Sequence, residues 1–384
     1  MIRLATDQET QQIIDLWSYC FDDSTEFIKF FFQSCYKPEN TLIVTDGDKL
    51  CSCLQLLPYR MQMRGKPVNI SYIVGVATWP EYRGKGYVSQ LLQYADKIMN
   101  ERRIYLSILL PFKYDFYRKF GWEVCYDLLT YHDMDLPVLR ANAPIGQISV
   151  IEINKDIELL SNCYHMFMRQ YNGFIVRCRE DWFKIIRDIE LDNGSGYIYK
   201  EMDHIRGYIL YTINDKRLII KELIYTNANA KSSLLQLAIS HKGQVNQISW
   251  KAPAIDTTYL AIKDSRGQLE KETFVMGRIH DVIESLSGLI VDGGNVKIKI
   301  IDPLYHKNNG CFFFKDENNR LIVTPTDDEP NIELNIHTLN QLLWGFISVD
   351  FACIEGYLKC PSNEALENLR KVFPPVNTFM IEEY

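Results

Sequence analysis

The chain has 384 residues, of which 47% are apolar and 24% charged, as in an ordinary globular protein of two or three domains. Its 42 basic and 49 acidic side chains give a net charge of −7, which disfavours nucleic-acid binding and is compatible with a cationic substrate. The start, MIRLATDQET, has no apolar core of signal-peptide length, and no apolar run approaches the roughly 20 residues of a membrane span. We therefore expect a cytoplasmic protein with no membrane partner.

The first 135 residues alternate helix and strand patterns and predict an α+β fold. Thr6 and Glu9 form a capping box before the first helix, and the DDSTE segment, in which Asp23 suits an N-cap, precedes a second helix. An amphipathic helix follows residues 82–89, and Gly121 ends a short helix. The expected strands and helices after the second helix are strands 41–46, 49–63, 68–78 and 104–110 and helices 88–99 and 113–120.

The loop YRGKGYVS, residues 82–89, connects a strand to a helix. The first N–H groups of a helix are unpaired and carry the positive end of its dipole, and glycine lets an anion approach the backbone closely. Arg83 and Lys85 would add charge-assisted contacts to a diphosphate. The Walker and Rossmann patterns are both missing. Taken alone, the loop is equally consistent with a charged, solvated turn.

With its surroundings, this segment resembles the GNAT family of acyl-CoA N-acyltransferases. The family motif, Arg/Gln-x-x-Gly-x-Gly/Ala, is matched by Arg83 and Gly86, while Val88 stands at the last motif position. In that family the loop amides hold the coenzyme A pyrophosphate, and the preceding strand bonds the pantetheine arm. The resemblance thus implies an acetyl-CoA site formed by Val76, Ala77, Thr78, Arg83, Gly84, Lys85, Gly86, Tyr87, Val88 and Ser89.

The segment FYRKFGW, residues 116–122, looks like the family's helix that carries a catalytic tyrosine, which makes Tyr117 the candidate. When an amine attacks a thioester, the departing thiolate must be protonated or stabilised, and a phenol can do this. The competing interpretation is that Tyr117 is one of many packed tyrosines. Tyr114, one turn earlier, is the weaker candidate for the donor.

Residues 136–282 repeat a strand–helix–strand order over 217–226, 228–240 and 244–250. The joining loop, TNANAK, has neither a glycine pair nor an arginine. The segment fits a degenerate acyltransferase-like domain that binds no coenzyme, and it fits an unrelated α+β domain about as well.

Alternating strands dominate the last hundred residues and are followed by short helices, the last of them capped by Ser362. This tail resembles a sterol-carrier-protein-like fold. Its apolar interior is expected to be core rather than a lipid site. The predicted strands are 295–300, 310–315, 320–325 and 331–336, and the predicted helices are 337–345 and 362–373.

The order of the three parts resembles the enhanced-intracellular-survival (Eis) acetyltransferases, with expected domains at 1–135, 136–282 and 283–384. Eis-type proteins also lack the last motif glycine, which agrees with Val88. The resemblance implies an acetyl-CoA-dependent N-acetyltransferase that acts directly on an amine, such as an aminoglycoside, a polyamine or a lysine side chain. It also implies a homo-oligomer, a hexamer in that family. An acyl-CoA or lipid carrier, and a catalytically silent scaffold, remain the alternatives.

Eis-type enzymes are thought to use the terminal carboxylate of the chain as the general base, here that of Tyr384. Without the resemblance, a frayed and solvated terminus would be equally expected. Phe21 and Asp22 resemble the substrate-facing loop of these enzymes. Together with Glu383, Asp22 would form an acidic mouth for a cationic amine.

No metal site is expected. The ten cysteines and seven histidines are scattered, and the sequence contains no CxxC, HExxH or HxH motif. Buried free thiols are the simplest interpretation of the cysteines.

Overall fold

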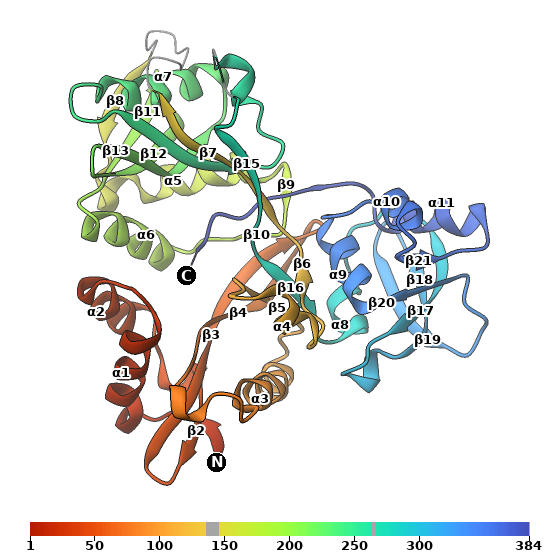
Figure 1. Ribbon diagram of the computed structural model, residues 1–384. Helices are drawn as coiled ribbons and strands as arrows, with labels where there is room; N and C mark the ends of the chain where they lie inside the picture. The colour runs from red at the N-terminus through yellow and green to blue at the C-terminus, as the bar shows by residue number, and fades with distance from the viewer. Residues whose placement is uncertain (136–145, 263, 265, 384) are drawn as a thin grey trace. The chain divides into compact units, whose positions relative to one another are not determined.

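The computed structural model, drawn in Figure 1, describes residues 1–135, 146–262, 264 and 266–383. Its chain forms two compact units. The first unit contains Met1–Tyr126, Phe274–Thr378 and Glu382–Tyr384, and the second contains Asp127–Thr273 and Phe379–Ile381. Within the described ranges, no helix combines the length and the apolar character that crossing a membrane requires.

The amino-terminal part of the first unit is a twisted sheet with helices on it. Its elements are β1 (Ile2–Leu4), α1 (Thr10–Cys20), α2 (Thr25–Ser34), β2 (Thr41–Asp46), β3 (Lys49–Met63), β4 (Lys66–Thr78), α3 (Tyr87–Glu101), β5 (Leu106–Leu109), α4 (Tyr114–Arg118), β6 (Glu123–Val124) and β16 (Met276–Ile279). The strand order is β1-β2-β3-β4-β5-β16-β6. Strands β1 to β4 are antiparallel neighbours, whereas β4 and β5 are parallel and α3 connects them.

Helix α3 has the apolar face that its sequence predicts. Leu91, Leu92, Ala95, Ile98 and Met99 are all buried on it, and they join one core cluster with residues of β2, β3 and β4. Helix α1 packs against β3 and β4 within a separate core cluster. The strands predicted at residues 41–46, 49–63 and 68–78 are present as β2, β3 and β4.

The starts of the first two helical segments test the predicted caps. The capping box is confirmed, since the Thr6 N–H donates to Glu9 Oε2 at 2.8 Å. The N-cap role considered for Asp23 is wrong. Ser24 caps α2, because it directly precedes the helix and its Oγ accepts from the Phe27 N–H at 3.1 Å. Asp23 Oδ2 instead accepts from Trp17 Nε1 at 2.8 Å.

The second unit has its own sheet, in the order β15-β7-β14-β13-β12-β11-β8. The predicted strand–helix–strand is present, because β13 and β14 pair in parallel and α7 connects them. The elements are β7 (Asp127–Asp135), β8 (Gln147–Val150), α5 (Ile153–Met168), β9 (Tyr171–Asn172), β10 (Phe174–Ile175), α6 (Arg179–Leu191), β11 (Ser195–Glu201), β12 (His204–Asn214), β13 (Arg217–Tyr225), α7 (Ala228–Ser240), β14 (Gln247–Pro253) and β15 (Leu269–Thr273).

The two sheets exchange strands along the chain. Strand β7 lies within the range predicted for the first domain, yet it pairs with β14 and β15 in the second sheet. Strand β16 lies within the range predicted for the second domain, yet it pairs with β5 and β6 in the first sheet. Sequence periodicity can indicate that a segment is a strand, but it does not indicate which other strand pairs with it. The sheet to which β7 or β16 belongs therefore cannot be predicted from periodicity. The residue boundaries of the domains stay a prediction.

The carboxy-terminal part of the first unit is a smaller sheet in the order β19-β18-β17-β20-β21. The Ser362 cap is confirmed by the bond that its Oγ accepts from the Ala365 N–H at 3.4 Å. The elements are α8 (Val282–Leu286), β17 (Asn295–Ile301), β18 (Gly310–Asp316), β19 (Leu321–Thr326), β20 (Ile332–Asn335), α9 (Ile336–Trp344), α10 (Val349–Ile354), β21 (Leu358–Lys359), α11 (Asn363–Val372) and β22 (Asn377–Thr378).

Candidate active site

A bulge in β4 opens the first sheet. Cys53 pairs with Ala77 and Gln55 pairs with Val74, so the single residue between the two on β3 faces two residues of β4. Gly75, one of these two, has φ +59°, a conformation that favours glycine. The parallel pairing of β4 with β5 ends at Ile73, although β4 continues to Thr78. Beyond Ile73 the two strands therefore no longer share hydrogen bonds.

A pocket of about 520 Å³ lies at this opening. Strand β4 supplies Ile73, Val74, Gly75, Val76, Ala77 and Thr78, and the remaining lining residues are Cys20, Phe21, Arg83, Val88, Leu110, Phe112 and Tyr117. The wall is largely apolar, and Arg83 is the one charged residue among these described lining residues. Such a cavity suits a flexible chain with few polar groups that ends in a charged headgroup.

The loop between β4 and α3 has the features of an anion site. Gly84 and Gly86 have φ of +76° and +77°, and an added Cβ on either residue would have no atom within 4 Å. Glycine is thus needed for the backbone conformation rather than for space. Gly86 is the N-cap of α3, and no side chain caps this helix. The unpaired N–H groups at the start of α3 can therefore donate hydrogen bonds to an anion.

The corresponding loop of the second unit differs in this respect. There Asn227 caps α7, since its Oδ1 accepts from the Ala230 N–H at 2.8 Å. A side chain of the protein already occupies the place that an anion would take. This agrees with the absence of the motif glycines and arginine from TNANAK.

Tyr117 lies on α4 and lines the pocket, with 2% of its surface exposed. Burial raises the pKa of its hydroxyl above the usual value, so the group is protonated at neutral pH. The rings of Phe112 and Phe116 surround it, at centroid distances of 5.5 and 5.2 Å. No described residue forms a hydrogen bond with its hydroxyl, which leaves the proton available to a ligand in the pocket.

The turn after α4 is fixed by buried polar groups. Gly121 has φ +82°, and its carbonyl accepts from Arg278 Nη1 at 3.1 Å and from Asn340 Nδ2 at 2.8 Å. Both donors are fully buried, and Arg278 is also ion-paired with Asp302 at 2.8 Å. A Cβ on Gly121 would lie 1.7 Å from Arg278 Nη1, so no other residue fits there without movement.

One face of helix α9 contacts residues between Gly121 and Tyr126, the segment that follows Tyr117 and α4. The contacting residues have the i, i+3, i+4, i+7 spacing of a single helix face. The contacts are His337 Nδ1 to Glu123 Oε2 at 3.5 Å, Asn340 Nδ2 to the Gly121 carbonyl at 2.8 Å, Gln341 Nε2 to the Val124 carbonyl at 3.1 Å and Trp344 Nε1 to the Tyr126 hydroxyl at 2.8 Å. Helix α9 thereby holds the end of α4 in place.

The pocket brings together only part of the predicted site. Among the predicted residues it gathers Phe21, Val76, Ala77, Thr78, Arg83, Val88 and Tyr117. The predicted residues outside the lining set are Gly84, Lys85, Gly86, Tyr87, Ser89, Asp22 and Glu383. Asp22 and Glu383 are exposed, and no carboxylate is among the described lining residues. The acidic mouth stays a prediction.

Tyr384, the predicted base, lies outside the described residues. The chain just before it is held at the first sheet, because the Tyr72 hydroxyl donates to the Glu382 carbonyl at 3.3 Å. Tyr72 belongs to β4 and directly precedes the part of that strand that lines the pocket.

Sequence reasoning missed six lining residues, namely Cys20, Ile73, Val74, Gly75, Leu110 and Phe112. Gly75 did carry a usable signal, because a glycine inside a strand pattern often marks a bulge. The other five are apolar or weakly polar residues whose position depends on tertiary packing.

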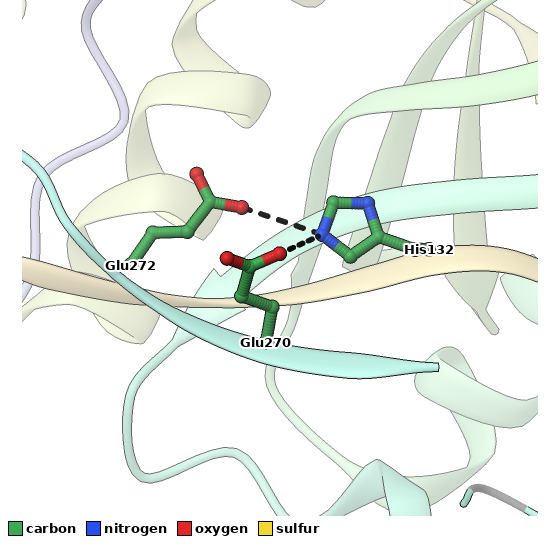
Figure 2. A group of neighbouring side chains, drawn as sticks. All are labelled: His132, Glu270 and Glu272. Carbon is green, nitrogen blue, oxygen red and sulfur yellow. Dashed lines mark hydrogen bonds and ion pairs between the residues drawn. The ribbon is translucent and has the colours of Figure 1, made fainter. Parts of the chain in front are cut away.

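One group of side chains in the second unit can ligate a metal ion (Figure 2). His132 Nε2 lies 3.1 Å from Glu270 Oε2 and 3.4 Å from Glu272 Oε1. Both carboxylates are thus already partners of the imidazole, and His132 and Glu270 are exposed. We assign this group no part in the pocket chemistry.

Comparison with known families finds three matches along the chain. Models of an acetyltransferase (GNAT) domain match residues 1–125 and, separately, residues 173–279, and a sterol carrier protein domain model matches residues 282–381. The chain therefore has two GNAT acetyltransferase domains and a sterol carrier protein domain, in the order that the resemblance to Eis proteins implies. The sequence of the middle segment fitted an acyltransferase-like domain and an unrelated α+β domain about equally. The match at 173–279 favours the first, because it identifies a second GNAT domain there.

Solved structures share this fold over the entire chain. A probable N-acyltransferase from Enterococcus faecalis has a TM-score of 0.90 at 20% identity and covers 100% of this chain and 99% of that chain. A GCN5-related N-acetyltransferase from Anabaena variabilis has 0.88 at 20% and covers 100% of both. Eis1 from Mycobacterium abscessus has 0.79 at 16% and also covers 100% of both. A comparison with curated proteins finds no match.

Proposed function

We propose that this GNAT protein transfers the acetyl group of acetyl-CoA directly to an amine. One observation carries the proposal: a single pocket is lined by the bulged β4, by Arg83 of the glycine loop and by Tyr117. The pyrophosphate would bind the first amides of α3 together with Arg83 and Lys85, and the pantetheine arm would lie along Val76–Thr78.

In the reaction that we propose, the amine nitrogen attacks the thioester carbon, the new C–N bond forms and the C–S bond breaks. Tyr117 donates its proton to the departing thiolate. The amine loses a proton to the carboxylate of Tyr384, and the bond from Tyr72 to Glu382 supports delivery of the terminus toward β4. The apolar wall around Tyr117 disfavours a thiolate as well as a phenolate, so the proton transfer does not depend on the phenol pKa alone.

The test measures coenzyme A release and acetylated product by mass across aminoglycosides, polyamines and a lysine-rich peptide. We expect Tyr117→Phe to lower turnover by about 10²-fold or more while acetyl-CoA still binds. Tyr114→Phe, one turn earlier on α4, is the matched control and should retain activity. A chain extended by one residue after Tyr384 should lose activity, because its carboxylate is displaced.

The opposite result would be binding of acetyl-CoA without product from any amine. That outcome would favour the acyl-CoA or lipid carrier, and the bound ligands would then need to be identified. We also propose a homo-oligomer, with a hexamer as the specific expectation from the Eis resemblance. Light scattering of the purified protein tests this independently of activity.

A further inference from the structure

A second pocket, of about 390 Å³, is formed entirely by residues of the second unit. One wall is a face of α5 that carries Ile157, Glu158, Ser161 and Asn162, whose i, i+1, i+4, i+5 spacing places them on the same side of the helix. The other wall is formed by the first turn of α6 and the two residues before it. Helices α5 and α6 contact each other (Figure 1). A cavity of this size lies in the range of small-molecule sites.

The buried part of this pocket is held by an ion pair and an aromatic ring. Arg177, just before α6, lines the pocket, and its Nη1 lies 2.8 Å from Glu222 Oε1 of β13, with 2% and 4% of the two side chains exposed. The Arg177 guanidinium also lies 4.8 Å from the ring centroid of Trp182, a second buried lining residue. The charge of Arg177 is therefore offset by Glu222, and this part of the site is fixed before any ligand binds.

The exposed part of the lining carries one group of each charge. Glu158, on α5, is exposed, and its carboxylate forms no hydrogen bond or ion pair with a described residue. Arg179, at the start of α6, is exposed as well. Its guanidinium contacts the ring of Phe183, 5.4 Å from the centroid, and it too has no hydrogen bond or ion pair with a described residue. Two opposite charges that line one pocket without pairing suit a ligand that carries both charges.

The neutral lining groups complete the chemistry of such a ligand. The Ser161 hydroxyl and the Asn162 amide form no hydrogen bond with a described residue, and each can donate as well as accept. A guanidinium binds a carboxylate through two parallel hydrogen bonds, and the Glu158 carboxylate can accept from an ammonium. Ile157 and the Trp182 ring add apolar surface for an aliphatic group. Carboxylate, ammonium and aliphatic group are together the parts of an α-amino acid.

We propose that this pocket binds a free amino acid with an apolar side chain, whose carboxylate contacts Arg179 and whose ammonium contacts Glu158. The residues of the second unit form the site alone, so binding does not depend on acetyl transfer in the first unit. The second unit thereby gains a ligand of its own, although Asn227 already occupies the anion position at the start of its helix α7.

The test is a calorimetric titration of the intact protein, without acetyl-CoA, with L-leucine and two analogues. Isopentylamine is leucine without its carboxylate, and isocaproate is leucine without its ammonium. We expect saturable binding of one leucine per chain, at least about tenfold tighter than either analogue, because each analogue lacks one charge-assisted hydrogen-bonded contact.

Two variants assign the charges to the residues. Glu158→Gln should weaken leucine binding about tenfold and leave the affinity for isocaproate unchanged, because isocaproate has no ammonium. Arg179→Gln should weaken leucine binding about tenfold and leave isopentylamine unchanged, because that analogue has no carboxylate. A merely structural role of either residue would weaken the protein's binding of all three ligands together. Glu180→Gln is the matched control, since Glu180 is exposed beside Arg179 but is not among the lining residues, and it should bind leucine as the wild type does.

Wild-type protein that does not bind leucine would overturn the inference, and so would equal affinity for leucine and either analogue. Leucine binding that both variants leave unchanged would also overturn it, because the ligand would then lie elsewhere. Unchanged melting temperatures should show that the variants are folded, since both residues are exposed. Both variants should also keep the wild-type affinity for acetyl-CoA, so a failure of this inference leaves the proposed acetyl transfer untouched.

Discussion

The contact between α9 and the end of α4 makes a specific prediction about Asn340. Replacing Asn340 with alanine removes the bond to the Gly121 carbonyl and also the bond that Asn340 Oδ1 accepts from the Ile279 N–H at 2.9 Å. The Gly121 carbonyl keeps Arg278 as a donor, but the Ile279 N–H is left buried and unpaired. We expect a loss of roughly 2–4 kcal/mol in the free energy of unfolding.

Asn340→Ala should also affect catalysis, because Tyr117 and Gly121 belong to the same turn at the end of α4. If the end of α4 moves, the phenol is misplaced, and an error near 1 Å lowers turnover by up to about 10²-fold. The glycine loop at residues 82–89, where we propose that acetyl-CoA binds, is a separate segment, so we expect kcat to fall while the affinity for acetyl-CoA stays within about twofold of wild type. Steady-state kinetics and calorimetric titration measure the two quantities.

A double-mutant cycle distinguishes positioning from general destabilisation. In a Tyr117→Phe background, Asn340→Ala should lower kcat little further, because the group that it positions is already gone. Thr338→Val is the control on the same helix, since it removes a partly buried hydroxyl that contacts the Tyr357 carbonyl (3.2 Å) and Asn335 Oδ1 (3.1 Å) and no residue of the segment after α4. An equal decrease in kcat in both backgrounds, or the same decrease in Thr338→Val, would refute the reasoning.

Three other predictions follow from the first unit. Arg83→Ala should weaken acetyl-CoA binding about tenfold, because a charge-assisted contact to the pyrophosphate is lost, and unchanged affinity in a titration would contradict it. Gly121→Ala should lower the melting temperature, since the added Cβ would lie 1.7 Å from Arg278 Nη1; Gly84→Ala, with open space around it, is the control, and equal melting temperatures for the two variants would count against the idea. Burial alone would raise the pKa of Glu123, but His337, Arg118 and the Val124 N–H lower it to about 2 from 4.5. Above pH 4.5 the Glu123 carboxylate thus contributes about 3 kcal/mol to the free energy of unfolding, and this contribution is lost as the pH falls toward 2. The melting temperatures of wild type and Glu123→Gln should therefore converge in acid.

Much of the first domain could be predicted from the sequence because its signals are local. The face of α3, the strands before it and the caps at Thr6 and Ser362 follow from spacing within single elements. The glycine loop and Tyr117 could be assigned because the resemblance to GNAT proteins rests on short motifs. For the same reason, they were found without any knowledge of the fold.

The remaining features depend on residues far apart in the sequence. Asn340 reads as an ordinary helix residue until its bond to Gly121 is seen. Gln55 looks like one polar position in a strand, and only the structure shows that it is fully buried beside the bulge at Gly75. The α2 cap was misassigned within one residue, because both Asp and Ser favour that position and the sequence does not say which one adjoins the helix.

The exchange of β7 and β16 has a consequence for the order in which a newly made chain can become active. Strand β6 joins the first sheet through β16, so the segment around α4 cannot be completed until residue 279 has left the ribosome. Helix α9, which holds the end of α4, is synthesised later still. A nascent chain carries the glycine loop early, but it gains a positioned Tyr117 only when nearly all of its length has been translated. Gene fragments that stop after the first GNAT domain should therefore yield inactive protein even where they remain in solution.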